Sequence, residues 1–330
     1  MRAVVLRCHG GPDCLTIEDV PEPEVGQEEV LVDVAATALN RADLLQVMGL
    51  YASPRPADVE IPGLEFSGTV ISVGSRVTLW KRGDQVMAID AGGAYAERVA
   101  VHERQLMPVP ARVGIADAAA IPEVFLTAWD ALVVQGGLTS GRWALVHAGA
   151  SGVGTAAIQI AKAIGARIAV TCSAGKVSAC QELGADLVID YGNQDFVTET
   201  AAATGERGVD VILDVIGGDY LERNLRAVAA QGRIIQVGLM GGGTTPVNLG
   251  LILTKRVALI GTVLRARPLE EKVALTQRFI REMLPLFATG ALRPIIDSRF
   301  PLDRIADAHR YMATNANTGK IVIDVVRGAL

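Results

Sequence analysis

The spacing of apolar residues changes about one third of the way along this 330-residue chain. Before about residue 120, apolar residues form short runs rich in Val, Ile and Thr, with Pro, Gly and Asp between them. This pattern is typical of strands joined by turns. The predicted strands are residues 3–6, 15–20, 30–36, 68–73, 85–89 and 95–101. This part of the chain is therefore predicted to form a compact β domain that resembles a barrel.

Strand and helix patterns alternate from about residue 117 onward. An alanine-rich stretch over 118–131 is predicted to be helical. Strands are predicted at 143–148, 168–171, 187–190, 209–215, 234–237 and 257–264, and helices at 176–183, 196–204 and 220–230. Strands that alternate with helices of this length indicate βαβ units, and hence a parallel sheet with right-handed crossovers.

The last part of the chain returns to a mixed pattern. An amphipathic helix is predicted after residue 264, with Val273, Phe279, Ile280 and Leu284 on its inner face. A strand at 295–300, a helix at 305–312 and a final strand at 321–325 follow. We expect this tail to fold back onto the first domain.

A turn of small residues joins the strand at 143–148 to a helix whose apolar residues recur from Ala156 to Ile164. A strand, a tight glycine turn and a helix form the start of a Rossmann unit, in which the helix N-terminus receives a pyrophosphate. The spacing departs from a strict G-x-G-x-x-G, and short glycine turns also occur where nothing binds. The flanking strand and helix favour a dinucleotide site. Its predicted residues are Ala150, Ser151, Gly152, Val153 and Gly154.

The next strand of this unit carries no acid where NAD enzymes usually hold the ribose hydroxyl. It continues into T-C-S-A-G-K, so Ser173 and Lys176 could bind a 2′-phosphate by hydrogen bond and charge. Tyr191, at the end of the third strand, could pack on adenine or donate to the same phosphate. NADPH is therefore favoured over NADH. The alternative is that Lys176 is only an exposed lysine and Ser173 only a helix cap.

Composition excludes several classes of partner. The net charge is −5 and no basic tract is present, so nucleic acid is not expected to bind. No apolar run approaches the ~18 residues of a membrane span, and the N-terminal run is too short for a signal peptide, so a cytoplasmic location is expected. The four cysteines form no C-x-x-C pair. They are predicted to be isolated, reduced thiols.

Five segments together identify a family. They are N-R-A-D-L-L-Q-V-M-G-L-Y at 40–51, P-G-L-E-F-S-G at 62–68, H-A-G-A-S-G-V-G-T-A-A-I-Q at 147–159, G-L-M-G-G-G at 238–243 and N-T-G-K-I-V at 317–322. Through them the chain resembles the medium-chain dehydrogenase/reductase superfamily along essentially its whole length. It is most similar to the zinc-independent, zeta-crystallin-like quinone oxidoreductases, and within them to the tumour-suppressor-inducible subgroup.

The resemblance implies an α/β fold of two domains with a nicotinamide cofactor in the cleft between them. A GroES-like β-barrel domain would comprise residues 1–121 and 265–330, and a Rossmann domain with a doubly wound parallel sheet would comprise 122–264. Zinc-dependent members carry a Cys and a His–Glu pair in the first domain. Here Asn40 replaces the cysteine and Leu64 precedes Glu65, so the catalytic zinc site is predicted to be absent. No cysteine lies between Cys14 and Cys172, so the four-cysteine structural zinc site is predicted to be absent too.

The reaction that the resemblance implies is NADPH-dependent reduction of a small quinone. Such a site must align donor and acceptor and offer hydrogen bonds to the developing oxyanion. Tyr51 and Asn40 suit that role, although Tyr51 could simply pack and Asn40 could simply hold its own turn. By the same resemblance, Thr127, the loop of Gly238, Leu239 and Met240, and Leu264 would surround the nicotinamide.

Two further expectations come from this resemblance. The apolar last strand at 257–264 is expected to join two copies into a homodimer, unless the following helix covers it. Two other functions stay open beside quinone reduction: reduction of enones or enoyl thioesters, and a largely non-catalytic role in binding NADPH. A phosphopantetheine-linked substrate would need a basic groove, for which Arg55, Arg265 and Arg267 are the candidates.

Overall fold

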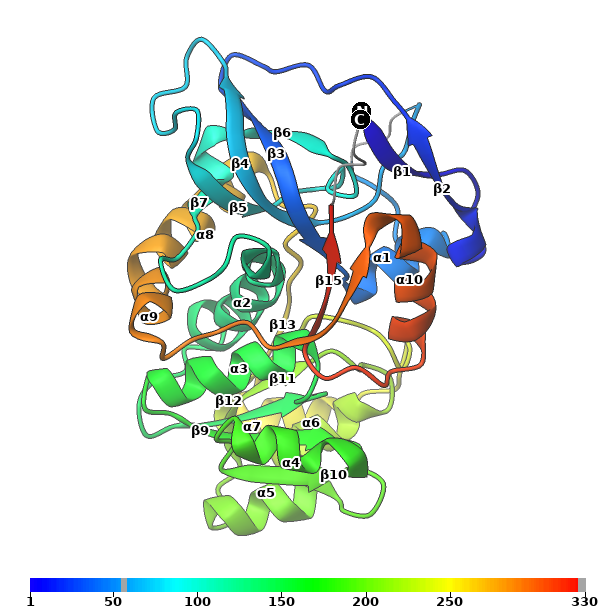
Figure 1. The fold of residues 1–330 in the computed structure, drawn as a ribbon. Helices are drawn as coiled ribbons and strands as arrows, with labels where there is room; N and C mark the ends of the chain where they lie inside the picture. Colours follow the sequence, from blue (N-terminus) through cyan, green and yellow to red (C-terminus); the bar gives the residue numbers. More distant parts are fainter. Residues whose placement is uncertain (55–57, 326–330) are drawn as a thin grey trace. The chain divides into compact units, whose positions relative to one another are not determined.

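The computed structural model describes residues 1–54 and 58–325, which divide into two compact units (Figure 1). The first comprises Met1–Leu126 together with the segment that begins at Leu264, and the second comprises Thr127–Val263. The sequence places the corresponding boundaries at 121/122 and 264/265. Arg55, one of the candidates for a basic groove, lies outside the described residues.

The first unit is built on a mostly antiparallel sheet. Its strands run in the order β14 (Ile296–Pro301), β15 (Lys320–Asp324), β3 (Glu29–Ala38), β4 (Glu65–Val73), β5 (Gln85–Ile89) and β7 (Met107–Pro108). β6 (Arg98–His102) pairs with the start of β3, while β15 pairs with its end. Because β15 lies beside β3, the tail belongs to the first unit, as the sequence predicts.

Helices complete the first unit around an apolar core that includes Val32, Phe66 and Ile323. They are α1 (Arg41–Val47), the start of α2 (Pro122–Trp129), α8 (Leu269–Glu282), α9 (Leu284–Thr289) and α10 (Ile305–Ala313). Val273 and Phe279 of α8 are buried as predicted, whereas Ile280 and Leu284 are only partly buried.

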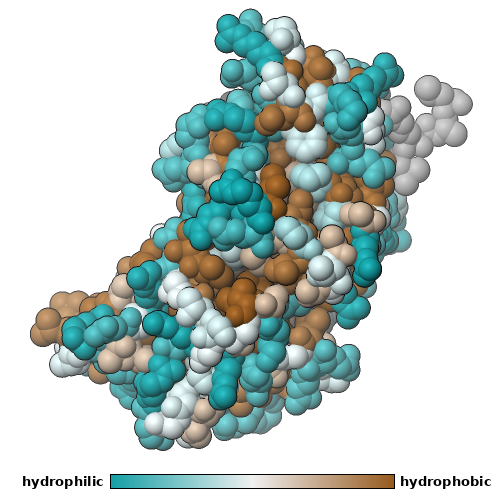
Figure 2. Space-filling model, turned by 90° about the vertical axis from the view of Figure 1, so that its left-hand side faces the viewer, coloured by the Kyte–Doolittle hydropathy of each residue, from teal (hydrophilic) through white to brown (hydrophobic). Residues whose placement is uncertain are grey.

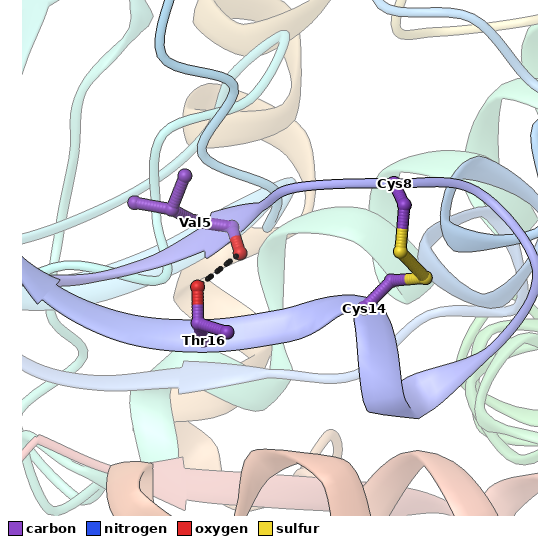
Figure 3. The surroundings of a disulfide bond; sticks show 4 residues. All are labelled: Val5, Cys8, Cys14 and Thr16. Atoms are coloured by element: carbon purple, nitrogen blue, oxygen red, sulfur yellow. Dashed lines mark hydrogen bonds between the residues drawn. A yellow bond between two sulfur atoms is a disulfide. The ribbon is translucent and has the colours of Figure 1, made fainter.

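A hairpin of β1 (Arg2–Leu6) and β2 (Leu15–Asp19) corrects the prediction for the cysteines (Figure 3). Cys8 and Cys14 form a disulfide, with their Cα atoms 5.1 Å apart. The reason is the register of the hairpin, because Leu6 pairs with Leu15 and the cysteines lie just beyond that pair. Cys172 and Cys180 are free and buried, but a hydrogen bond between them lowers the pKa of Cys172, so they are not isolated either.

The second unit is a parallel sheet with the strand order of a Rossmann fold. In space the strands run β10 (Leu187–Asp190), β9 (Arg167–Cys172), β8 (Trp143–His147), β11 (Val209–Asp214), β12 (Val228–Gln236) and β13 (Ala258–Gly261). Numbered along the chain, this is the order 3-2-1-4-5-6 of dinucleotide-binding sheets. The helices are α3 (Gly152–Ala163), α4 (Val177–Glu182), α5 (Phe196–Thr204), α6 (Tyr220–Ala227) and α7 (Leu249–Lys255). The predicted fold class is confirmed.

Two predicted elements have the wrong bounds. The helix expected over 118–131 is three segments: a 3₁₀ turn at Asp117–Ala120, α2, and a π-helical segment at Asp130–Gln135. The strand expected over 257–264 is only β13, because α7 precedes it and ends at Arg256 in a left-handed conformation. Among the described residues, none of the helices has the length and apolar character needed to cross a bilayer.

Candidate cofactor and acceptor site

The glycine turn between β8 and α3 has the geometry of an anion-binding helix start. Ser151 caps α3, because its Oγ accepts a hydrogen bond from Gly154 N at 3.0 Å. A Cβ on Gly154 would lie 2.4 Å from the carbonyl oxygens of Ala148 and Gly149, so only glycine fits there. The first N–H groups of a helix have no partner within it, and together with the helix dipole they favour a pyrophosphate. The turn therefore fits a dinucleotide.

The residues predicted to select the phosphorylated cofactor lie next to one another. Asp190, the last residue of β10, pairs with Cys172, the last residue of β9. Tyr191 N then donates to Cys172 O at 3.1 Å, and Lys176 N donates to Ser173 O at 2.9 Å. Tyr191 is 54% exposed. The structure thus brings Ser173, Lys176 and Tyr191 to the same edge of the sheet.

An acid that the sequence argument left out, Asp190, also lies at this edge. Its Oδ1 accepts from Gly192 N at 3.1 Å, and its Oδ2 accepts from Asn193 Nδ2 at 2.6 Å. Both carboxylate oxygens are therefore engaged in the turn that Asp190 starts. This arrangement leaves Lys176 as the charged candidate for a 2′-phosphate.

Buried polar groups hold the loop predicted to line the nicotinamide. Asp214, at the end of β11, accepts from Ile216 N at 2.6 Å and from Gly217 N at 3.0 Å. The side chain of Gln236 donates to Gly238 O at 2.6 Å, and Met240 N donates to Val215 O at 3.2 Å. Neither Asp214 nor Gln236 was predicted from the sequence to belong to the site. A polar residue at the last position of each neighbouring strand was the available signal.

His147, the last residue of β8, is buried. Its ring contacts Thr171 Oγ1 through Nδ1 at 3.1 Å and Asn224 Oδ1 through Nε2 at 2.7 Å. Asn224 Nδ2 donates in turn to Asp214 at 2.9 Å. Burial lowers the pKa of His147. The histidine therefore belongs to the network that fixes the loop after β11.

Two other predicted cofactor residues lie on connecting segments. Thr127 is a buried residue of α2. Leu264 follows β13 as the first residue of the chain's return to the first unit, and its carbonyl accepts from Arg267 N at 3.2 Å. Their contact with a nicotinamide stays a prediction.

In the first unit, Asn40 is bonded at both ends of its side-chain amide. Its Oδ1 accepts from Lys320 Nζ at 2.6 Å, and its Nδ2 donates to Glu65 Oε1 at 3.0 Å. Its backbone N–H donates to Asp43 Oδ2 at 2.8 Å, which closes a capping box at the start of α1. Burial raises the pKa of Asp43 to about 6. Asn40 is therefore rigidly placed, with its amide committed to internal bonds.

Lys320 forms a buried ion pair with Glu65, the residue that follows Leu64 in the segment where the resemblance would place a His–Glu pair. Lys320 Nζ lies 2.7 Å from Glu65 Oε1, and both side chains are almost fully buried. Glu65 Oε2 accepts from Glu123 N at 2.8 Å, and the neighbouring Leu64 is buried and apolar. Zinc prefers thiolate, imidazole and unpaired carboxylate ligands, so these residues do not fit the metal. No group of three potential ligands among His, Cys, Asp and Glu was found among the described residues.

Tyr51 lies in the same unit, and the guanidinium of Arg265 covers its ring. The Arg265 Cζ is 5.1 Å from the ring centroid. Burial raises the pKa of Tyr51 above its ordinary value, and the charge of Arg265 partly opposes that rise. The phenol therefore stays protonated at neutral pH and is able to donate a hydrogen bond.

A cavity of about 370 Å³ in the first unit is lined by Arg265 and Arg267, two of the candidates for a basic groove. Lys272 and His102 also line it, but so do Asp90 and Glu29. The cavity therefore has mixed charge.

Known oxidoreductases are similar to this protein over nearly the whole chain, in sequence and in fold. Residues 26–111 match the alcohol dehydrogenase GroES-like domain, and residues 183–323 match the zinc-binding dehydrogenase domain. The 2-methylene-furan-3-one reductase of Solanum lycopersicum is 30% identical, over 98% of this chain and 79% of the relative. The quinone oxidoreductase of Mus musculus is 29% identical, over 98% and 97%. The structure of Escherichia coli quinone oxidoreductase complexed with NADPH superposes with a TM-score of 0.89, at 28% identity, over 98% of this chain and all of that one.

Proposed function

The chain belongs to the medium-chain dehydrogenase/reductase superfamily of oxidoreductases, and on that basis we propose that it is a zinc-independent NADPH:quinone oxidoreductase. Two observations in the first unit support the proposal: the Tyr51 phenol lies against the Arg265 guanidinium, and Glu65, a possible metal ligand, is bonded to Lys320. This arrangement suits an acceptor that needs a hydrogen bond and no Lewis acid.

Quinone reduction requires few catalytic groups from the protein itself. Bound NADPH would supply a hydride, and a proton from solvent completes reduction of the quinone to the hydroquinone. Tyr51 donates a hydrogen bond to the oxygen on which negative charge develops, which lowers the barrier. Asn40 acts by orientation, because Lys320 and Glu65 already occupy its amide. This assigns different roles to the two predicted catalytic residues.

The preference for NADPH is supported by the edge formed by Ser173, Lys176 and Tyr191. The ammonium group of Lys176 and the hydroxyl groups of Ser173 and Tyr191 would complement a dianionic phosphate. Asp190 is the acid at this edge, and each of its carboxylate oxygens accepts a hydrogen bond from its own turn. The relative from Escherichia coli was solved with NADPH, which agrees with this assignment.

A second candidate is reduction of an activated carbon–carbon double bond. The similarity to a furanone reductase favours it. Hydride would then add to carbon, and Tyr51 would stabilise an enolate in place of a hydroquinone anion. The cavity lined by Arg265 and Arg267 contains acidic residues as well, so it gives little support to a phosphopantetheine-linked substrate.

The test is NADPH consumption by the purified protein with a panel of ortho-quinones, para-quinones and simple enones. The proposal expects turnover of quinones and slow or no turnover of enones. Turnover confined to enones would favour the second candidate. Tight NADPH binding without turnover of any acceptor would favour a non-catalytic role.

We also propose that the protein is a homodimer joined along β13. This strand lies at the edge of the sheet, and its Leu259 is 45% exposed. Leu249 and Leu253 of the preceding helix are exposed too, at 69% and 78%. Figure 2 shows one face of the molecule, on which apolar and polar residues are mixed. An open apolar edge is a pairing surface.

A cytoplasmic location stays a prediction. The Cys8–Cys14 disulfide argues against it, because disulfides are rare in reducing compartments.

Sedimentation measurements test the dimer. The wild type is expected to sediment as a dimer, and Leu259→Lys as a monomer, because charged side chains block edge pairing. Leu79→Lys is the matched control, since Leu79 is similarly exposed (55%) but lies in the other unit. A monomeric wild type would refute the interface.

A further inference from the structure

We propose that Arg265 is a positioning residue for catalysis, which fixes the ring of Tyr51 and polarises its hydroxyl toward the acceptor. The inference rests on the proposed role of Tyr51 as hydrogen-bond donor. The sequence suggested Arg265 only as a candidate residue of a basic groove.

The guanidinium of Arg265 is held in one orientation by two hydrogen bonds. Its Nε donates to Ala91 O at 2.7 Å, and its Nη2 donates to Gln46 Oε1 at 2.8 Å. Only 3% of the residue is exposed. A planar guanidinium held at two of its nitrogens keeps one face in a fixed orientation. A lysine ammonium is not planar and could not do so. The geometry is therefore specific for arginine.

That fixed face lies over the ring of Tyr51. A cation within about 6 Å of an aromatic centroid is attracted to the ring, and more strongly when water is excluded. The 5.1 Å separation between Arg265 Cζ and the Tyr51 centroid meets this condition. Tyr51 follows α1 on a stretch without regular secondary structure, so the backbone there does little to hold the ring. Arg265 supplies the missing support.

The positive charge has a second effect. It favours negative charge on or near the phenol oxygen, and thus opposes the effect of burial on the pKa of Tyr51. The acidic groups that act on Tyr51 in the other direction are Glu123 and Asp43. A phenol next to a fixed cation is a stronger donor to a developing oxyanion.

Helix α1 connects the two parts of the acceptor site. Asn40 caps its first turn, and Gln46 near its last residue holds Arg265. Gln46 Nε2 also donates to Glu60 Oε1 at 2.6 Å, which fixes the amide so that its oxygen faces the guanidinium. The helix thus positions Asn40 directly and Tyr51 through Arg265.

A double-mutant cycle tests this coupling with a neutral quinone as acceptor. Arg265→Met is expected to lower kcat/KM about 10-fold, with little change in the KM for NADPH. In a Tyr51→Phe background the same substitution should cost less than about 2-fold, because the hydroxyl through which Arg265 acts is gone. Arg265→Lys should recover little of the lost kcat/KM, because lysine lacks the planar guanidinium. Lys272→Met, which removes a positive charge from the lining of the same cavity, is the control and should leave kcat/KM unchanged.

Equal losses in the two backgrounds would overturn the inference and leave Arg265 a structural residue. A loss that appears only with anionic acceptors would overturn it in favour of a basic groove. Failure of the wild type to reduce any quinone would instead refute the proposed function.

A second readout does not depend on turnover. Spectroscopic titration, taken as the difference between the wild type and Tyr51→Phe, should show a higher pKa for Tyr51 once Arg265 is replaced by Met. An unchanged pKa would contradict the polarising role. If Arg265→Met does not fold, Gln46→Leu should lower kcat/KM in the same direction by loosening Arg265, and an unchanged rate would contradict the inference.

Discussion

Two polar residues of the acceptor site, Asn40 and Tyr51, are equally suitable donors by chemistry alone. The structure separates them, because Lys320 and Glu65 occupy both ends of the Asn40 amide. Those partners lie 25 and 280 residues away along the chain. Residue type and the family resemblance suggested both side chains for the proposed site, but the division of roles that we propose depends on these distant contacts.

Tyr51→Phe is expected to lower kcat about 100-fold with a quinone acceptor, because one donor to the developing oxyanion is lost. Binding of NADPH, measured by fluorescence titration, should be unchanged. The substitution keeps the ring on which Arg265 stacks, so the fold should be preserved. Unaltered turnover would reduce Tyr51 to a packing residue.

Lys176→Ala is expected to weaken NADPH binding by about 1–3 kcal/mol and to spare NADH, because only the phosphorylated cofactor offers an anion at this position. The measurement is the KM for each cofactor with the same quinone. Lys162→Ala is a suitable control, since Lys162 is another lysine of the same unit and pairs with Asp186. Equal losses with NADPH and NADH would show that Lys176 does not contact the 2′-phosphate.

At the scale of elements, local pattern predicted most strands and helices. β5, β10 and α5 have the predicted bounds, because apolar alternation and flanking turn residues define their ends. β13 and α7 were poorly predicted, since apolar residues lie on both sides of Lys255 and Arg256 and their periodicity does not show where the helix ends. Arg256 ends it by adopting a left-handed conformation, which its sequence does not signal.

The Cys8–Cys14 disulfide was missed for a related reason. Its cysteines come together only through the pairing of β1 with β2, and spacing rules for motifs such as C-x-x-C do not include hairpin register. The same limit applies to Arg265, which reaches Gln46 and Ala91 across more than 170 residues.

Cys14→Ser is expected to lower the free energy of unfolding by about 2 kcal/mol, because the six-residue separation closes a short loop in the unfolded chain. Urea denaturation measures the loss. Wild type treated with a reducing agent is the matched control and should unfold like the variant. Titration of four thiols in the untreated, folded protein would show that the disulfide does not form.

At the scale of the whole molecule, the features expected of a cofactor site lie in one unit and those proposed for the acceptor site lie in the other. The Rossmann unit has the strand order, the glycine turn and the polar edge that binding a nicotinamide dinucleotide requires. The first unit has the Tyr51 phenol, the Arg265 guanidinium that lies over its ring and the buried Lys320–Glu65 ion pair. Sequence pattern was enough to assign the fold, whereas the chemistry of the acceptor depends on buried side chains.

The most direct test compares two acceptors of one ring size, a six-membered para-quinone and a six-membered enone. The quantity is kcat/KM with NADPH, after subtraction of the uncatalysed rate. The account predicts that the quinone is preferred by at least about 100-fold, which corresponds to roughly 3 kcal/mol of transition-state stabilisation. A preference of that size for the enone would contradict it.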